Sequence, residues 1–387
     1  MPTLVLGGTV TGLGAVRSLG SAGIPAYVCC APDDVAAKSR WSRHLGETLP
    51  EFTTPERLAA FLAPLPFERL VLLPCSDHWA EAVAALPEQF RSRFPSFVSP
   101  LSVLRQLNDK EAFAGLVRAL DVPHPQTHFV HSIADLDGVD LAAGTQYFLK
   151  ARSSQKFIAK TGVKAYMVSS PGEIRSRVTE LAEAGLGVVL QEYVPGPATN
   201  HFFVDGFADG RGAILARFAR QRQRMHPPHF GNSTFLRSVA LESVPDIVAT
   251  VDRLITGCGL RGIFSVELKR DERTGIARVI EVNARAWWYV GYATACGVNV
   301  VEMTWRAALG LPVAPADGRY RVGRTCVYVR PDFRACRALR QEGKLSLATC
   351  LPQWLGGEHM IFSARDPMPL LSRAWREAGA WLRGKGR

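Results

Sequence analysis

A pair of glutamates stands at matched positions on either side of a short turn. Residues 263–269 alternate apolar and polar side chains from Phe264 onward, and residues 279–283 do so from Ile280 onward, which is the pattern of two half-buried strands. If the turn between them is symmetric about Thr274, the pairing places Glu267 directly opposite Glu281. Two opposed carboxylates destabilise a sheet unless a positive charge lies between them. The hairpin is therefore expected to bind a cation.

Two further polar side chains share the face of Glu281. Alternate residues of a strand point to the same side, so Asn283 and Arg285 lie beside it. The carboxylates of Glu267 and Glu281 and the side-chain oxygen of Asn283 are an all-oxygen set that suits Mg²⁺. The hairpin thus predicts a magnesium site, and the alternative is a solvated face with a shifted register.

Three segments upstream of the hairpin complete a set of motifs. Residues 108–111 open a predicted helix, residues 147–150 end a predicted strand, and residues 188–196 form a strand that ends at a Pro-Gly-Pro break. In this order, together with the hairpin, they resemble the motifs of the ATP-grasp ligases, the group that includes biotin carboxylase and D-alanine–D-alanine ligase. The resemblance covers about residues 1–310.

This resemblance implies a nucleotide site. Two lysines would contact phosphate oxygens of ATP, and the strand before the Pro-Gly-Pro break would contact adenine mainly through its backbone, with Glu192 as the side chain best placed to take part. The expected ATP-binding residues are Lys110, Lys150, Gln191, Glu192, Tyr193 and Val194. Glu267, Glu281 and Asn283 would hold Mg²⁺, as two ions, and Mn²⁺ could replace it.

The resemblance also implies a reaction. In the resembled ligases a carboxylate attacks the γ-phosphate of ATP, and an amine or a thiol then displaces phosphate from the acyl phosphate. Cations and lysines would neutralise the charge that grows during phosphoryl transfer. Arg285, the predicted catalytic residue, would hold the transferred group bidentately, and pairing with Glu267 is its alternative. A carboxylase or thiol ligase is the alternative activity, although nothing in the sequence marks a biotin or thioester partner.

Two positions depart from the family pattern. The acidic residue that many members use for the ribose hydroxyls is replaced by Ala198 and Thr199, so Asn200 or Asp205 would take its place. The loop over the phosphates, usually glycine-rich, carries hydroxyls and lysines over residues 151–162. Both departures favour a further alternative, a nucleotide-binding module without turnover.

Two places are expected to bind the substrates. The N-terminal third alternates strands and helices, which predicts a doubly wound parallel sheet, and ligands bind beyond the carboxyl ends of such strands. Ser76 and Asp77 follow one of these strands and could hold an amine or a hydroxyl. Arg220 and Arg222 share one face of a strand-like segment and suit a carboxylate or phosphate, unless they form a solvated charged strand. His226 is a candidate base for the amine.

The charge of the chain is concentrated in its tail. The net charge is +11, and residues 317–387 hold 14 basic and 6 acidic side chains. A nucleic-acid binder would instead spread its charge along a groove. In this tail Leu371, Trp375, Ala378 and Leu382 recur at helical spacing among basic residues. The pattern predicts an amphipathic helix that packs on the body or contacts an anionic membrane surface.

The length of 387 residues predicts an α/β protein of several domains. We expect a doubly wound parallel-sheet domain over residues 1–105, a two-subdomain ATP-grasp domain over residues 106–310 with a lid at about 122–190, and a basic appendage over residues 311–387. The expected partners are a small-molecule carboxylate and an amine, with no nucleic acid. Without a signal peptide or an apolar run of ~18 residues the chain is expected in the cytoplasm, with its eight cysteines as thiols.

Overall fold

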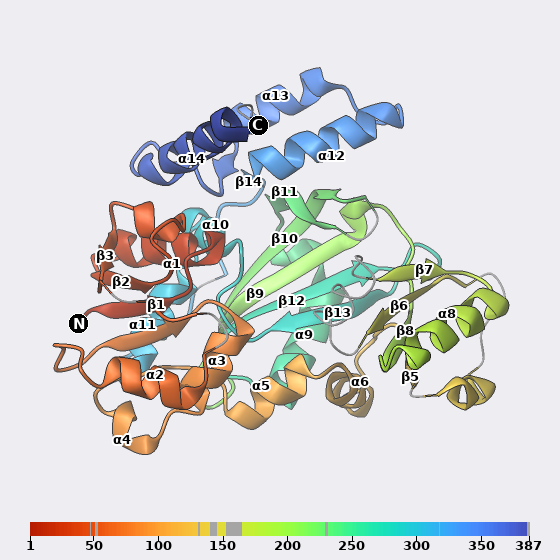
Figure 1. The fold of residues 1–387 in the computed structure, drawn as a ribbon, viewed down its shortest axis with the longest axis horizontal. Coiled ribbons are helices and arrows are strands. Elements are labelled where there is room, and N and C mark those ends of the chain that lie inside the picture. The colour runs from red at the N-terminus through yellow and green to blue at the C-terminus, as the bar shows by residue number, and fades with distance from the viewer. Residues whose placement is uncertain are drawn as a thin grey trace.

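The structure is a computed structural model in which three sheets lie side by side and a set of helices covers one end (Figure 1). It describes residues 1–46, 48–50, 53–130, 132–139, 145–151, 165–228, 231–316 and 318–384. No helix among these residues is both long enough and apolar enough to cross a bilayer.

The N-terminal sheet consists of short parallel strands in the order β3-β2-β1-β4. Its strands are β1 (Thr3–Leu6), β2 (Ala26–Cys29), β3 (Ser42–His44) and β4 (Val71–Pro74), and the helices that connect or follow them are α1 (Val10–Ser21), η1 (Ala36–Lys38), α2 (Pro55–Leu62), α3 (Asp77–Ala84) and α4 (Glu88–Arg91). Every residue of β1 and β4 is buried, which is typical of a parallel sheet covered by helices. The predicted parallel sheet is confirmed.

A seven-stranded sheet forms the centre of the molecule, in the order β13-β12-β9-β10-β11-β14-β15. Its strands are β9 (His201–Ala208), β10 (Ile214–His226), β11 (Asn232–Ser238), β12 (Gly262–Arg270), β13 (Ala277–Asn283), β14 (Thr325–Val327) and β15 (Glu358–His359). Neighbouring strands are antiparallel except β14 and β15. The predicted hairpin is β12–β13, at one edge of this sheet.

Helices cover both faces of the central sheet. One face carries α5 (Leu101–Asn108), α6 (Lys110–Ala119) and α9 (Pro245–Gly257), whose apolar side chains share a core with β9, β12 and β13. The other face carries α10 (Val290–Cys296) and α11 (Val300–Ala308), which also pack against α1 of the N-terminal domain. The helix predicted to open at residues 108–111 is α6, and Asp109 caps it by accepting hydrogen bonds from two backbone amides.

A third sheet lies beside the hairpin and carries the predicted lid (Figure 1). Its strands are antiparallel, in the order β5-β8-β6-β7. They are β5 (Thr127–Val130), β6 (Tyr147–Ala151), β7 (Tyr166–Val168) and β8 (Val188–Glu192), with η2 (Ile133–Gly138) after β5 and α8 (Pro171–Glu183) packed on the sheet. Except for Ala151, the predicted phosphate loop lies outside the described residues.

The C-terminal region, predicted as an appendage, is built into the molecule. Its strands β14 and β15 extend the central sheet, and its helices are α12 (Val329–Gln341), α13 (Leu347–Gly356) and α14 (Met368–Gly384). Asp366 ties it to the N-terminal domain by accepting hydrogen bonds from Arg17 and Ser39. Cys336 and Cys350 form a disulfide, so the prediction of eight thiols is wrong for these two; the other six cysteines are buried thiols.

Candidate functional site

The two glutamates of the hairpin occupy paired positions, as predicted. β12 and β13 place Glu267 opposite Glu281, and Asn283 follows two residues later on the same strand. Between this pair and the turn, the strands are shifted by one residue from the predicted register, so that Leu268 pairs with Val279. Ile280 is the extra residue of a β-bulge, and beyond it the predicted register is restored. A register shift of one residue would turn Glu281 to the other face of the sheet, so the bulge sets the geometry of the pair.

The two carboxylates differ in their surroundings. Glu267 accepts a hydrogen bond from Arg222 at 2.9 Å and lies 2.9 Å from Nδ1 of His201. Burial alone would raise the pKa of Glu267, but Arg222 and the hydrogen bond to His201 lower it to about 2. Partial desolvation in the cleft, followed by the charge of Glu267, raises the pKa of Glu281. Glu267 is thus a stable anion, whereas the charge of Glu281 is poorly compensated.

The two predicted lysines lie next to this pair. Lys150, on β6, donates a hydrogen bond from Nζ to Oε1 of Gln191 at 3.1 Å. Burial, together with the charge of Lys110, lowers the pKa of Lys150 to about 8, while Glu281 and Glu267 act in the opposite direction. Burial likewise lowers the pKa of Lys110, which is the first residue of α6, and Glu281 opposes that shift. Two lysines and two glutamates from four segments therefore converge on one place.

A cavity of about 210 Å³ lies between the lid sheet and the hairpin. The predicted residues in its lining are Lys150, Gln191, Glu192, Tyr193, Val194, Arg222, Glu267 and Glu281. Phe148 also lines it, and the Phe148 and Tyr193 rings meet edge to face with their centroids 5.3 Å apart. The cavity combines the aromatic rings of Phe148 and Tyr193 with charged groups at the hairpin, which suits a base joined to an anion.

Two titratable residues in the lining of this cavity were not predicted from the sequence. Lys269 is 3% exposed, and its Nζ lies 4.6 Å from the centre of the Tyr193 ring. His201 is 7% exposed, and its Nε2 is buried without a hydrogen-bond partner among the described residues. Burial and the charge of Arg222 lower the pKa of His201 to about 4, so its ring is neutral at pH 7. Lys269 shares the strand face of Glu267, so the alternation of side chains could have revealed it.

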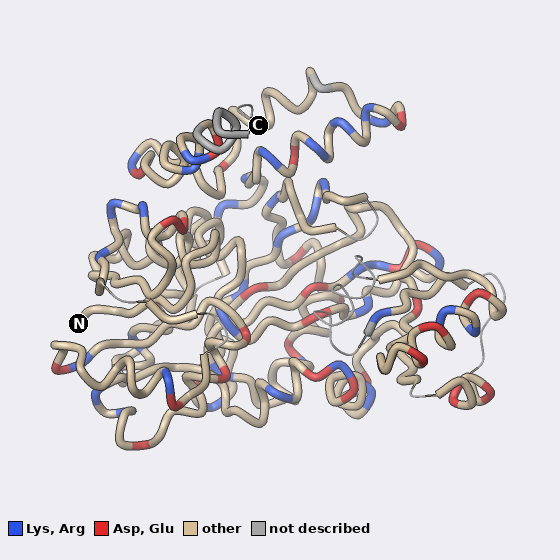
Figure 2. The backbone as a smooth tube through the Cα atoms, in the orientation of Figure 1, with Lys and Arg blue, Asp and Glu red and all other residues tan. Residues whose placement is uncertain are grey.

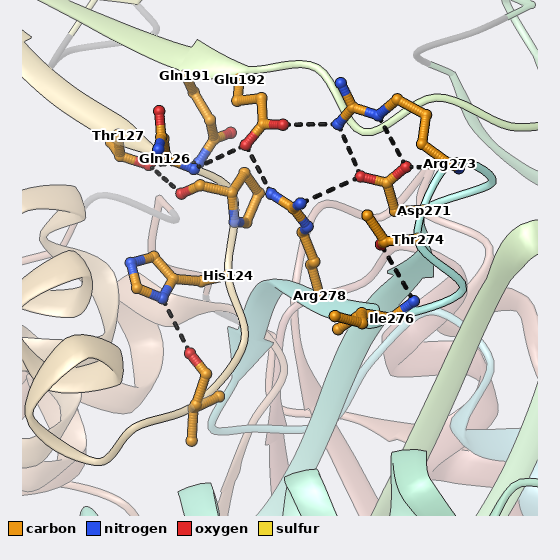
Figure 3. A network of polar contacts seen from close by, with 12 residues as sticks. His124, Gln126, Thr127, Gln191, Glu192, Asp271, Arg273, Thr274, Ile276 and Arg278 are labelled. Carbon is orange, nitrogen blue, oxygen red and sulfur yellow. Dashed lines mark hydrogen bonds and ion pairs between the residues drawn. The ribbon is translucent and has the colours of Figure 1, made fainter. Parts of the chain in front are cut away.

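The side chain of Glu192 is bound by other groups of the protein (Figure 3). It accepts hydrogen bonds from the guanidinium groups of Arg273 and Arg278, both at 2.6 Å, and from the backbone amide of Gln126 at 3.2 Å. Both arginines also pair with Asp271 in the hairpin turn. These ion pairs fasten β8 of the lid sheet to the hairpin, so a contact of this residue with adenine would use the backbone.

Arg285 pairs with Asp77, a predicted substrate residue, and not with Glu267. Its guanidinium donates to both carboxylate oxygens of Asp77, at 2.9 and 3.0 Å. Asp77 is the first residue of α3, and Ser76 caps that helix by accepting a hydrogen bond from the amide of Trp79. The carboxyl end of β4 in the N-terminal domain is thereby joined to the strand that carries Glu281.

The predicted arginine row is real, but its members face other protein groups. Arg220 is 3% exposed and donates to Asp205 at 2.6 Å, and Arg222 pairs with Glu267. Arg224, the next on this face of β10, holds Asp332 of α12. Asp205 is fully buried, so it is closed to a ribose. His226 ends β10 and is absent from the cavity lining.

Comparison with known proteins identifies the fold. Residues 187–325 match the family described as ATP-grasp in the biosynthetic pathway with Ter operon. The chain is 21% identical over 318 residues to a D-aspartate ligase from Enterococcus faecium, which covers 77% of this chain and 74% of that protein. A carbamoyl phosphate synthase large chain from Thermus thermophilus is 24% identical over 241 residues, but these are 20% of its length.

Solved structures are similar over most of the chain. An L-amino acid ligase from Bacillus licheniformis has a TM-score of 0.61 at 18% identity, covering 84% of this chain and 78% of that one. An N5-carboxyaminoimidazole synthetase from Staphylococcus aureus has a TM-score of 0.65 at 12% identity, covering 88% and 85%. These likenesses confirm the predicted ATP-grasp fold, and the names of the relatives agree with the predicted class of enzyme, a ligase.

Proposed function

We propose that this ATP-grasp protein is an ATP- and Mg²⁺-dependent ligase that activates a carboxylate as an acyl phosphate and joins it to an amine. The observation that carries the proposal is the meeting of Glu267, Glu281 and Lys150 in the lining of one cavity with aromatic walls. Lys110 is close enough for its charge to act on Glu281 and Lys150. Adenine would lie against residues 191–194, and the phosphates would extend toward the two lysines. The residue roles below are parts of this proposal.

The hairpin carboxylates fit a divalent cation. Among the described residues none donates a hydrogen bond or an ion pair to Glu281, whereas Glu267 has two cationic or polar partners. No group of three or more His, Cys, Asp or Glu side chains in the described ranges could hold a metal, so the proposed donors are two carboxylates and the oxygen of Asn283. Mg²⁺ bound there would offset the negative charge of the phosphates during transfer. We propose two ions, which Mn²⁺ could replace.

The proposed chemistry has two steps. An oxygen of the substrate carboxylate attacks the γ-phosphorus of ATP, and ADP leaves. The amine nitrogen then attacks the carbonyl carbon of the acyl phosphate, phosphate leaves, and the amine gives up a proton. Arg285 would hold the transferred group with two parallel hydrogen bonds once Asp77 releases it, and the released carboxylate of Asp77 would bind the ammonium group of the second substrate. His226 stays a weaker candidate for the proton acceptor, because it is absent from the cavity.

Amino acids are the proposed substrates. A D-aspartate ligase and an L-amino acid ligase are among the relatives, and the Asp77–Arg285 pair offers one negative and one positive group, which match an ammonium and a carboxylate. Arg220 and Arg222 would then act through protein groups, by positioning Asp205 and Glu267. We further propose a cytoplasmic location, and a boundary at about residue 105 between the N-terminal domain and the ATP-grasp domain.

The test is a screen of amino acids and small carboxylates in pairs, with ADP and phosphate release measured for the purified protein. Release that requires both members of a pair, and a coupled product of the corresponding mass, would support the ligase. Glu281→Gln serves as the blank, and Glu242→Gln, an exposed glutamate far from the hairpin in sequence, is the matched control. ATP binding without release for any pair, in the presence of Mg²⁺, would favour the alternative of a nucleotide-binding module.

A further inference from the structure

Apolar side chains lie exposed on the C-terminal helices. Trp375 of α14 is 79% exposed and Leu355 of α13 is 78% exposed, while Leu371 and Leu351, one helical turn earlier, are 48% and 55% exposed. Residues four positions apart lie on one face of a helix, so each pair forms a short apolar ridge. Packing onto the body, one of the two predictions for the stripe on α14, is therefore wrong for Leu371 and Trp375.

The same region presents positive charge. We call α12, α13, α14 and their connections, residues 329–384, the C-terminal layer; it lies together on one side of the molecule (Figure 1). Figure 2 shows that its Lys and Arg positions follow α12 and α14. Its exposed basic side chains are Arg330, Arg334, Arg337, Arg340, Lys344, Arg365 and Arg376, and its exposed acidic ones are Glu342 and Glu377. The outer surface of the layer is thus strongly basic.

Two carboxylates of the layer are turned inward. Asp332 is fully buried and pairs with Arg224 of β10 at 2.7 Å, and Asp366 is 1% exposed and pairs with Arg17 of α1 at 3.0 Å. Both arginines belong to the body of the molecule. These ion pairs fix the layer in place and remove negative charge from its outer surface.

We propose that the C-terminal layer docks on membranes that contain anionic phospholipids. Tryptophan is favoured at the boundary between headgroups and acyl chains, leucines at the tips of two helices can enter the apolar region, and arginines attract the lipid phosphates. A nucleic acid would use the arginines and leave the leucines in water. A second copy of the chain would bring arginine against arginine. A lipid surface satisfies the apolar ridges and the charge together.

Vesicle binding by the full chain tests this surface. Vesicles of phosphatidylcholine alone and of phosphatidylcholine with phosphatidylserine are sedimented with the protein, and tryptophan emission is recorded in parallel. We expect binding to the anionic vesicles only, a loss of binding as salt is raised, and a blue shift of the emission. Trp375→Phe should bind but show a smaller shift, because the exposed indole is the one that enters the interface.

Charge reversal gives the second arm of the test. Arg334→Glu with Arg337→Glu should lower partitioning by at least tenfold, since each basic side chain near an anionic surface contributes roughly fivefold. Arg69→Glu with Arg91→Glu, two exposed arginines of the N-terminal domain, should leave partitioning unchanged, and circular dichroism checks that both variants fold. Equal binding to neutral vesicles, equal loss in both double variants, or no binding to the anionic vesicles would overturn the proposal. A doubled mass in sedimentation velocity without vesicle binding would assign the surface to a second copy of the chain.

Discussion

Replacing Glu281 by glutamine should make the protein more stable and less able to bind Mg²⁺-ATP. Glu281 faces Glu267 across the hairpin, and removing one of two opposed like charges is worth about 1 kcal/mol of unfolding free energy. The gain should depend on pH. Because the folded state raises the pKa of Glu281, its charge costs stability only as pH rises above about 4.5. The advantage of glutamine is therefore expected at pH 7 and should fade toward pH 4.

The nucleotide should cancel this difference in stability. At a concentration 100 times its Kd, a ligand that binds only the folded state adds about 2.7 kcal/mol. If the variant binds Mg²⁺-ATP tenfold more weakly, the same concentration adds about 1.4 kcal/mol. With the nucleotide bound, the variant and the parent should therefore have similar free energies of unfolding. The variant's release of ADP should fall to background.

Urea unfolding at pH 4.5 and pH 7, with and without Mg²⁺-ATP, measures all four free energies. Glu242→Gln should change none of them by more than about 0.5 kcal/mol, as a surface substitution away from any site. Two results together would refute the reasoning that the two carboxylates form a cation site. Glu281→Gln would be less stable than the parent without ligand, and Mg²⁺-ATP would stabilise both proteins by the same amount.

Three further predictions concern Lys150, Arg285 and the ion pair between Arg224 and Asp332. Because Lys150 has a pKa of about 8, the phosphates of ATP should drive its protonation. ATP binding should therefore take up protons above pH 8, and the affinity should fall up to tenfold per pH unit. Calorimetry in buffers of different ionisation enthalpy measures the proton uptake, which Lys150→Arg should abolish. Arg285→Lys keeps the charge but loses the bidentate geometry, so turnover should fall at least tenfold while ATP affinity, measured by titration, changes less than about threefold. Asp332→Ala leaves Arg224 buried and unpaired, which should cost about 3–5 kcal/mol in urea unfolding, and the double variant with Arg224→Met should recover part of that loss.

Local patterns in the sequence were sufficient for the hairpin and the parallel sheet. Alternation and turn symmetry placed Glu267 opposite Glu281, because a strand has a side-chain period of two. The bulge at Ile280 was missed, although the two adjacent apolar residues Val279 and Ile280 break the alternation at that point. Lys269 was missed because a single lysine on a strand is usually solvated.

Partners far apart in the chain were beyond the reach of these patterns. The arginines of β10 were predicted on one face, which is correct, but Asp205 and Asp332 that bind two of them lie on other elements. The same holds for Arg285 and Asp77, which are 208 residues apart. Charge alone suggested a separate tail, whereas strand pairing with β11 makes β14 part of the central sheet.

The ion pairs between Glu192 and the hairpin limit how the lid sheet can move relative to the central sheet. Arg273 and Arg278 hold one end of β8, so a swing of the lid sheet that preserves these contacts must have its axis close to them. Such an axis would lie beside residues 191–194, where we propose that the base binds, and atoms near it would travel little. The opposite end of the cleft, where Lys150 and Glu281 face each other, would travel furthest, so a nucleotide could keep its base seated while its phosphates are exchanged.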